Sequence, residues 1–350
     1  MFTSGVFGYL FDYLLWWVLF LSLVIHTWCF FRYFPRTKFR KSGLLIGNLL
    51  VFNCLLGVLA LAGESYFRFA AVETDSFGVS LPARRWFALY AKLNSVGCRD
   101  EEWTTKKPSN VRRIAFVGDS FTYGWGIKQP EDRFSDLIQP MFDARSPGTV
   151  EVMNVAKPGW GTDAELQPVQ EIIDVFHVDE VVLCHVLNDI EELLPVESAF
   201  NPTRPPEPGF FNIDSSCLLD YLYRRLYVPR LAQVRGYEDW IAKAYENQEI
   251  MDAHRRNLEA VATVCRERGV TLRVALMPFV KTTGTGLDQA AIHKRLRHFL
   301  ELHGIPVVDL LSALEGRSPN ALVVNAKDAH PNEAAHVLFA DAIWNAFFAP

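Results

Sequence analysis

Cysteine is scarce in this 350-residue chain and shows no regular spacing. Two of the six cysteines lie inside long apolar runs, and Cys184 lies in a short apolar run typical of a buried strand. The other three are Cys98, Cys217 and Cys265. This pattern indicates neither a disulfide framework nor a zinc site, so we expect free structural thiols. Histidines and carboxylates also lack metal-ligand spacing on any expected helix, and neither a metal nor another cofactor is predicted.

A strong net charge is also missing. The chain has 35 Lys and Arg against 40 Asp and Glu, a formal charge of −5. A nucleic-acid-binding protein needs a basic surface, so this balance gives no support for a nucleic-acid partner. The length allows one sizeable domain with additional segments.

Two long stretches contain no Asp, Glu, Lys or Arg at all. They are residues 13–31 and 43–63. Spanning a bilayer takes about 20 apolar residues, and buried helices of soluble proteins are shorter and usually carry a polar stripe. The sequence therefore predicts a membrane anchor of two transmembrane helices within residues 1–63.

The residues before the first span contain no Lys or Arg, whereas the loop between the spans is strongly basic. Its basic residues are Arg32, Arg36, Lys38, Arg40 and Lys41. Basic loops stay in the cytoplasm, so we expect both chain ends, and all residues after the second span, on the other side, periplasmic or extracellular. A cleavable signal peptide is disfavoured because nothing basic precedes the first span, which is also too long for a signal core.

From residue 111 onward, short apolar runs alternate with amphipathic segments. The expected strands are 114–117, 150–156, 180–187, 270–278 and 305–310. The expected helices are 130–143, 162–176, 248–269, 290–304 and 332–348. Strands alternating with helices predict an α/β fold with a parallel sheet of about five strands, covered on both faces. Thr162 followed by Glu165 has the pattern of a capping box at the start of a helix.

The predicted organisation therefore has three parts: an anchor (1–63), a connecting arm (64–110) and an α/β domain (111–350). The domain is interrupted at about 191–246 by a proline-rich segment followed by interleaved aromatics and arginines. This insertion is either a lid over a substrate or a surface excursion packed on the domain.

Four polar segments are candidates to meet at the carboxyl edge of the sheet, where ligands of such folds bind. They are centred on Ser120 in "GDSFTYGWG", Gly159 in "KPGWGT", Asn188 in "NDI", and the pair Asp328 and His330 in "KDAHPN". A serine nucleophile needs a base to take its proton and an acid to orient that base, which the last segment supplies. Backbone N–H groups of Ser120 and Gly159, with the Asn188 amide, are suitable donors to an oxyanion.

These four blocks, in this order, closely resemble the SGNH or GDSL-type hydrolase family, over roughly residues 112–348. The resemblance implies a flavodoxin-like α/β/α sandwich and esterase, lipase or acyl-transfer chemistry. It implies Ser120, Gly159, Asn188 and His330 as the four residues that name the family. Asp119 is interpreted as a turn residue that bonds local backbone.

The chain departs from the family pattern at three positions. Phe121 stands where the family label has leucine, and Val186 stands where a small residue is common. Asp328 precedes His330 by two residues, whereas Lys327 occupies the commoner position three residues before. The two-residue spacing resembles the subset of the family that acts on acetyl groups of cell-surface polysaccharides. His185 and His336 are expected to be structural.

Three functions follow as hypotheses. The first is a membrane-tethered serine esterase acting on an ester-bearing substrate, a polysaccharide or a lipid, through an acyl-Ser120 intermediate. The second is an O-acetyltransferase of cell-surface polysaccharide that uses the same triad, with a membrane acyltransferase as partner. The third is a catalytically silent membrane protein that binds glycans or a partner; the complete set of site residues argues against it.

Overall fold

The computed structural model describes residues 3–34, 40–76, 80–194, 216–227, 230, 236–282 and 286–349. The chain forms two compact units. The first comprises residues 1–72, 79–82 and 203–230, and the second comprises residues 73–78, 83–202 and 231–350.

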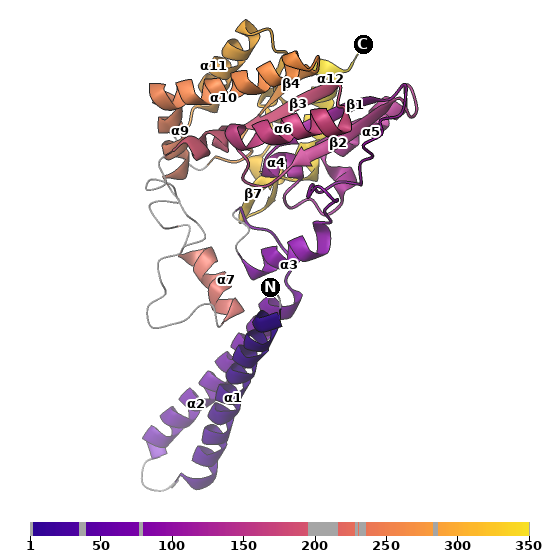
Figure 1. The fold of residues 1–350 in the computed structure, drawn as a ribbon. Coiled ribbons are helices and arrows are strands. Elements are labelled where there is room, and N and C mark those ends of the chain that lie inside the picture. Colours follow the sequence, from indigo (N-terminus) through magenta and orange to yellow (C-terminus); the bar gives the residue numbers. More distant parts are fainter. Residues whose placement is uncertain are drawn as a thin grey trace. The chain divides into compact units, whose positions relative to one another are not determined.

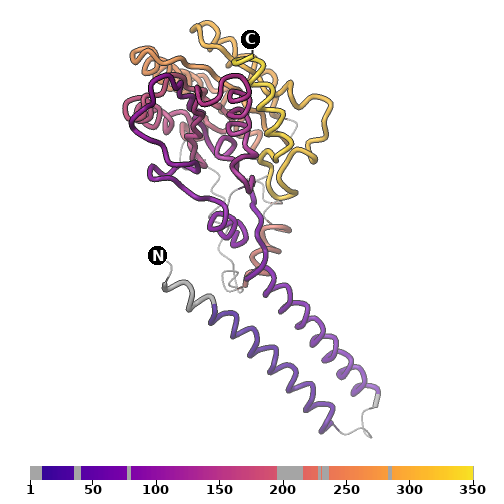
Figure 2. Tube along the Cα trace, turned by 90° about the vertical axis from the view of Figure 1, so that its right-hand side faces the viewer, coloured from indigo at the N-terminus to yellow at the C-terminus, as the bar shows by residue number. Residues whose placement is uncertain are grey.

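The first unit is built on an antiparallel pair of long helices, α1 (Thr3–Tyr33) and α2 (Arg40–Ser65), visible as indigo and violet coils in Figure 2. Tyr13 Oη lies 2.7 Å from Ser65 Oγ, which joins the first part of α1 to the end of α2. Phe20 packs so closely against Gly57 that an added Cβ would lie 2.6 Å from its ring. Large apolar side chains are exposed along both helices, and both are long and apolar enough to cross a membrane.

Two shorter helices complete the described part of this unit. The chain leaves α2 through one π-helical turn, η1 (Tyr66–Ala70). Part of the sequence insertion returns to this unit as α7 (Cys217–Leu226), whose N-cap Ser216 accepts a hydrogen bond from the Leu219 backbone N–H.

The second unit contains a sheet of five parallel strands in the order β2-β1-β3-β4-β5. Its strands are β1 (Arg112–Gly118), β2 (Val150–Ala156), β3 (Glu180–Val186), β4 (Thr271–Met277) and β5 (Val307–Asp309). This is the flavodoxin-like order, with a topological switch between β1 and β3. The α/β class and the five-stranded parallel sheet expected from the sequence are confirmed.

Helices cover both faces of this sheet (Figure 1). Alternation along β1 sends Ala115 and Val117 into one core and Ile114 and Phe116 into the other, because successive strand residues point to opposite faces. The first core contains side chains of α6 (Thr162–Phe176), α9 (Tyr237–Glu246), α10 (Gln248–Glu267) and α11 (Gln289–Leu302). The second contains side chains of α5 (Phe134–Asp143) and α12 (Glu333–Phe347).

Shorter elements connect these layers. Within the described residues, the remaining helices are α3 (Leu81–Tyr90), α4 (Ser120–Tyr123), η2 (Pro130–Asp132), η3 (Leu187–Leu193), η6 (Ser312–Leu314) and η7 (Pro319–Ala321). A two-stranded antiparallel hairpin, β6 (Val323–Asn325) with β7 (Asp328–Pro331), precedes α12.

Two local expectations from the sequence differ from the structure. The helix expected at 130–143 begins as the 3₁₀ turn η2 and continues as α5, and the polar segment around His330 forms strand β7. The capping box at Thr162 also does not form: Gly161 is the N-cap, and the Thr162 hydroxyl lies 3.0 Å from His254 Nδ1. Residues 195–215 of the insertion lie outside the described residues.

Candidate active site

The turn after β1 places Ser120 at the carboxyl edge of the sheet. Ser120 is the first residue of the short helix α4, and the Asp119 side chain caps this helix by accepting from the Phe121 backbone N–H at 2.8 Å. A Cβ on Gly118 would lie 2.3 Å from Thr122 Oγ1, so the turn can close this tightly only with glycine at that position. The local function expected for Asp119 is confirmed.

The β7 strand brings a histidine and a carboxylate to Ser120. His330 Nε2 lies 2.8 Å from Ser120 Oγ, and His330 Nδ1 lies 2.6 Å from Asp328 Oδ1. Residues two apart in a strand point to the same side, which lets a two-residue spacing place base and acid together. Ala329 between them is exposed, whereas Asp328 is fully buried and Ser120 and His330 are each 8% exposed.

Trp125 covers one face of the His330 ring. The two rings are nearly parallel, with centroids 5.5 Å apart, and the Trp125 indole Nε1 donates to the Asp75 carbonyl at 3.0 Å. The Phe121 ring lies 5.3 Å from the imidazole at a tilt of 57°. These aromatic contacts restrict rotation of the imidazole about its side-chain bonds. Neither was expected from the sequence, because they depend on the tertiary fold.

Residues 73–76 form hydrogen bonds with the β6–β7 hairpin. Ser76 Oγ donates to the Lys327 carbonyl at 3.2 Å and accepts from the Ala329 N–H at 3.0 Å, so one hydroxyl bridges the residues that flank Asp328. Glu73 forms an ion pair with the Lys327 side chain, and Asn325 Nδ2 donates to the Thr74 carbonyl at 3.0 Å. Residues 73–76, which follow the first unit in sequence, therefore help to hold the hairpin in place.

The two other expected site residues follow the neighbouring strands. Asn188 lies two residues beyond the end of β3, and its Nδ2 donates to Asp119 Oδ2 at 3.2 Å. Gly159 lies three residues beyond the end of β2, with φ of +79°, a left-handed conformation that favours glycine. The sheet pairs Ala156, the last residue of β2, with Gly118 at the end of β1, so both turns leave the same edge.

A group of buried carboxyls lies behind this edge. Asp119, Glu165 and Asp189 are at most 1% exposed. Burial, with repulsion from Asp189, raises the pKa of Asp119 to about 7. Burial and the neighbouring carboxyls Asp189 and Asp119 raise the pKa of Glu165 well above its usual value. Neither carboxyl oxygen of Glu165 has a hydrogen-bond partner among the described residues. Ionisation of Glu165 is therefore disfavoured at neutral pH.

The other histidines singled out in the sequence have structural positions. His336 Nδ1 accepts from the Phe134 backbone N–H at 3.0 Å. His185 Nδ1 lies 2.9 Å from Asp189 Oδ2. Burial lowers the pKa of each imidazole to about 3, so both are neutral at physiological pH.

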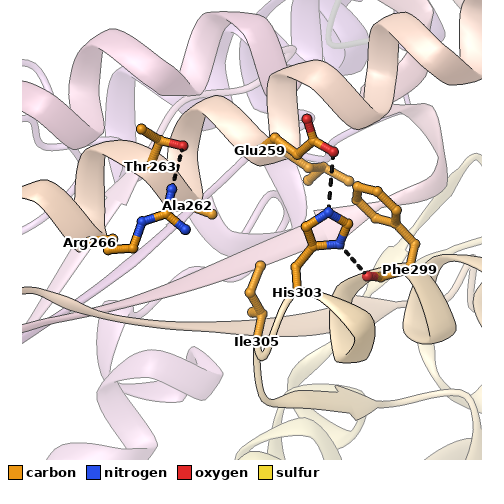
Figure 3. A pocket seen from close by; sticks show the side chains of 8 residues that line it. Glu259, Ala262, Thr263, Arg266, Phe299, His303 and Ile305 are labelled. Carbon is orange, nitrogen blue, oxygen red and sulfur yellow. Dashed lines mark hydrogen bonds and ion pairs between the residues drawn. The ribbon is translucent and has the colours of Figure 1, made fainter.

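A separate shallow hollow lies between α10 and α11 (Figure 3). In it His303 Nε2 lies 3.3 Å from a Glu259 carboxylate oxygen, His303 Nδ1 lies 2.8 Å from the Phe299 carbonyl oxygen, and Arg266 donates to the Thr263 hydroxyl. Among its lining residues no serine or cysteine is present, and none of the four sequence blocks contributes to it. The contacts among Ser120, His330 and Asp328 are at the edge of the sheet instead.

The sequence of residues 116–338 matches the GDSL-like Lipase/Acylhydrolase family. Because this match spans well over half of the chain, the protein belongs to that family. Its catalytic triad is a family feature, and Ser120, Asp328 and His330 are the residues whose geometry corresponds to one. The resemblance inferred from the four sequence blocks is confirmed.

Several solved structures are similar in fold. One is the esterase EstA from a Pseudoalteromonas species, at 13% identity and a TM-score of 0.43, covering 68% of this chain and 96% of that one. Another is an acetylxylan esterase from Geobacillus stearothermophilus, at 16% identity and 0.43, covering 70% and 98%. A third is the lipase Lip_vut3 from a goat rumen metagenome, at 14% and 0.45, covering 68% and 99%. No curated protein matched the sequence.

Proposed function

We propose that the chain is a membrane-tethered serine esterase that cleaves O-acyl groups through an acyl-Ser120 intermediate. The observation that carries this proposal is the continuous chain of contacts from Ser120 Oγ to His330 Nε2 (2.8 Å) and from His330 Nδ1 to Asp328 Oδ1 (2.6 Å). In this assignment residues 1–63 are the anchor and residues 111–350 are the catalytic domain.

The proposed reaction has two halves. His330 takes the hydroxyl proton as Ser120 Oγ attacks the ester carbonyl carbon, and Asp328 holds the imidazole and stabilises its charged form. The carbonyl oxygen becomes an oxyanion that accepts from the backbone N–H groups of Ser120 and Gly159 and from the Asn188 amide. His330 then protonates the leaving alcohol. Water, deprotonated by the same imidazole, releases the acyl group and restores Ser120.

The proposed substrate is an O-acylated glycan of the cell surface. The basic loop 32–41 between two apolar helices supports an orientation with the catalytic domain outside the cytoplasm. The two-residue spacing of Asp328 and His330 supports an acetyl ester of a polysaccharide, through the family subset that it resembles.

A second candidate is transfer of the acyl group to a sugar hydroxyl. Ser120 and His330 are each only 8% exposed, and a transferase needs a site that keeps water from the acyl-enzyme. The two candidates share every step up to acyl-Ser120 and differ only in the acceptor.

The test is ester cleavage by the full-length protein in detergent, with an aryl acetate and an O-acetylated polysaccharide as substrates. Ser120→Ala and His330→Ala should each remove nearly all turnover, and the double variant should lose little more, because the two residues act as one unit. Asp328→Asn should also reduce turnover severely, but less than either of these two substitutions. Full activity of Ser120→Ala would overturn the proposal. Consumption of the aryl acetate with formation of an acetylated sugar, in place of free acetate, would identify a transferase.

A further inference from the structure

The first turn of α7 is fastened to the end of α2 by one buried carboxylate. Glu64, the second-last residue of α2, accepts from the Ser216 hydroxyl at 2.7 Å and from the Leu218 backbone N–H at 2.9 Å. Its other oxygen accepts from the Cys217 N–H at 3.1 Å and from Arg68 Nε at 2.7 Å. A carboxylate is well placed there, because the first N–H groups of a helix lack partners within the helix and carry partial positive charge.

One face of α7 packs against the same end of α2 and η1. The Tyr221 ring stacks on Phe67, with centroids 3.8 Å apart and planes at 22°. Leu218 lies where a Cβ on Gly63 would be 3.2 Å from its methyl groups. Together with the Glu64 contacts, this packing fixes α7 beside the point where the second apolar helix ends, at the end opposite the basic loop.

A second face of α7 is apolar and exposed. Leu222 and Leu226 lie one turn apart and are 37% and 52% exposed, and Tyr227 follows at 48%. The opposite edge is polar, with Arg224 paired to Asp220 at 2.8 Å. A helix with one packed face, one exposed apolar face and one charged edge is typical of helices that lie in a membrane interface.

The surroundings of this face indicate what covers it. Tyr66 and Phe69 of η1 are exposed at the same end of α2, and aromatic side chains concentrate where membrane helices meet water. Arg225 and Arg230 are exposed at and beyond the α7 C-terminus, and arginines of this kind attract anionic headgroups. Tyr66 and Phe69 extend the exposed apolar surface of α1 and α2 to η1, which α7 contacts, and the two arginines add positive charge beside it.

We propose that α7 is a membrane-surface helix whose partner is the phospholipid bilayer. Leu222 and Leu226 enter the boundary between headgroups and acyl chains, while Arg225 and Arg230 meet anionic phosphates. Glu64 sets the depth of the helix by holding its first turn at the end of α2. This gives the α7 part of the insertion a lipid contact, independent of which reaction Ser120 performs.

The test measures the depth of single positions on α7 in the full-length protein, placed in nanodiscs of phosphatidylcholine with phosphatidylglycerol. Cys29→Ala and Cys54→Ala remove the two half-exposed thiols, and the other four cysteines are buried. An environment-sensitive fluorophore is attached to Leu226→Cys or to Leu222→Cys. Arg224→Cys is the matched control, because it lies on the same helix but on the charged edge.

Quenchers in the two phases decide the result. A nitroxide on the lipid acyl chain should quench the label at 226 and 222 severalfold more than at 224, and aqueous iodide should show the reverse order. Equal quenching at 226 and 224 by both reagents would overturn the proposal. Protection of 226 and 222 from iodide without quenching by the lipid nitroxide would also overturn it, because a protein surface would then cover the face.

Discussion

Asn188 donates a hydrogen bond from its side-chain Nδ2 to Asp119 Oδ2, 3.2 Å away. This contact joins the turn after β3 to the turn after β1, and the Ser120 hydroxyl lies 3.3 Å from the same carboxylate oxygen. An amide nitrogen carries two hydrogens, so one can hold Asn188 in place while the second donates to a substrate oxygen. Asp119 thus positions a proposed oxyanion donor.

Asn188→Ala should reduce kcat and leave the Michaelis constant almost unchanged. The amide donates most strongly once the carbonyl carbon is tetrahedral, so its loss affects the transition state more than the bound substrate. Removing one oxyanion donor typically costs on the order of 100- to 1000-fold in rate. Steady-state kinetics with an aryl acetate measure both constants.

Asp189→Ala is the matched neighbour for that experiment. Asp189 is a buried residue of η3, and its Oδ2 accepts from the Val186 backbone N–H at 2.9 Å. We expect its replacement to lower the unfolding temperature more than kcat. Near-normal turnover of Asn188→Ala combined with loss in Asp189→Ala would mean that the third sequence block is assigned one residue too early.

Ser76→Ala should lower kcat although Ser76 is not expected to contact substrate. Its hydroxyl bridges the Lys327 carbonyl and the Ala329 N–H, on either side of Asp328. A small displacement of Asp328 would misalign His330, and we expect a loss of roughly 10-fold, since misplacement by about 1 Å can cost 100-fold. Ser76→Thr, which keeps the hydroxyl, should restore activity; equal losses in both variants would contradict a positioning function.

Much of the fold could be predicted from the sequence because local patterns indicate its strands and helices. The apolar runs at β1 and β3 are short, continuous and rich in β-branched residues, as strands buried on both faces must be. Three of the four polar blocks follow strand ends, and parallel strands bring those ends to one edge. The place of Ser120 at that edge therefore followed from pattern and order, whereas His330 lies in the separate hairpin strand β7 and was assigned from the chemistry of a triad and the family resemblance.

The sequence-based predictions failed or were incomplete where contacts between residues far apart in the sequence determine the local structure. Thr162 and Glu165 match a capping box locally, yet the Thr162 hydroxyl faces His254 of α10 and Glu165 is buried. The Ser76 contacts link residues about 250 positions apart in the sequence. No local pattern signals such pairs.

Glu165→Gln should stabilise the protein at alkaline pH and have little effect near pH 4. The folded-state pKa of Glu165 is raised well above the value of 4.5 that it has when exposed, chiefly by burial. Above pH 4.5 the unfolded chain releases this proton while the folded protein keeps it, so the free energy of unfolding falls as pH rises toward the folded-state pKa. Glutamine cannot ionise, so the stability of the variant should fall less with pH.

Thermal unfolding of the two proteins at a series of pH values measures this difference. The gap in unfolding temperature should widen in favour of Glu165→Gln as pH increases from about 4.5, the exposed value. A constant gap would mean that the pKa of Glu165 is the same in the folded and unfolded states, and a gap of opposite sign would mean that its carboxylate is stabilised in the fold.

The orientation of the chain should depend on the basic loop between the apolar helices. A reporter that is active only outside the cytoplasm, fused after Pro350, should be active. Neutral replacement of Arg32, Arg36, Lys38, Arg40 and Lys41 together should reduce that activity and increase the signal of a cytoplasmic reporter at the same site. Activity of the cytoplasmic reporter in the unmodified chain would contradict the proposed location.

The central claim is that Ser120 is a nucleophile activated by His330, and covalent labelling tests it most directly. A fluorophosphonate reacts with activated serine hydroxyls, and peptide mass spectrometry of the labelled full-length protein locates the modified residue. The account predicts modification at Ser120, abolished in Ser120→Ala and strongly slowed in His330→Ala, because the free hydroxyl is a weak nucleophile without its base. Labelling at another serine, or equal labelling of Ser120 in the His330→Ala variant, would contradict it.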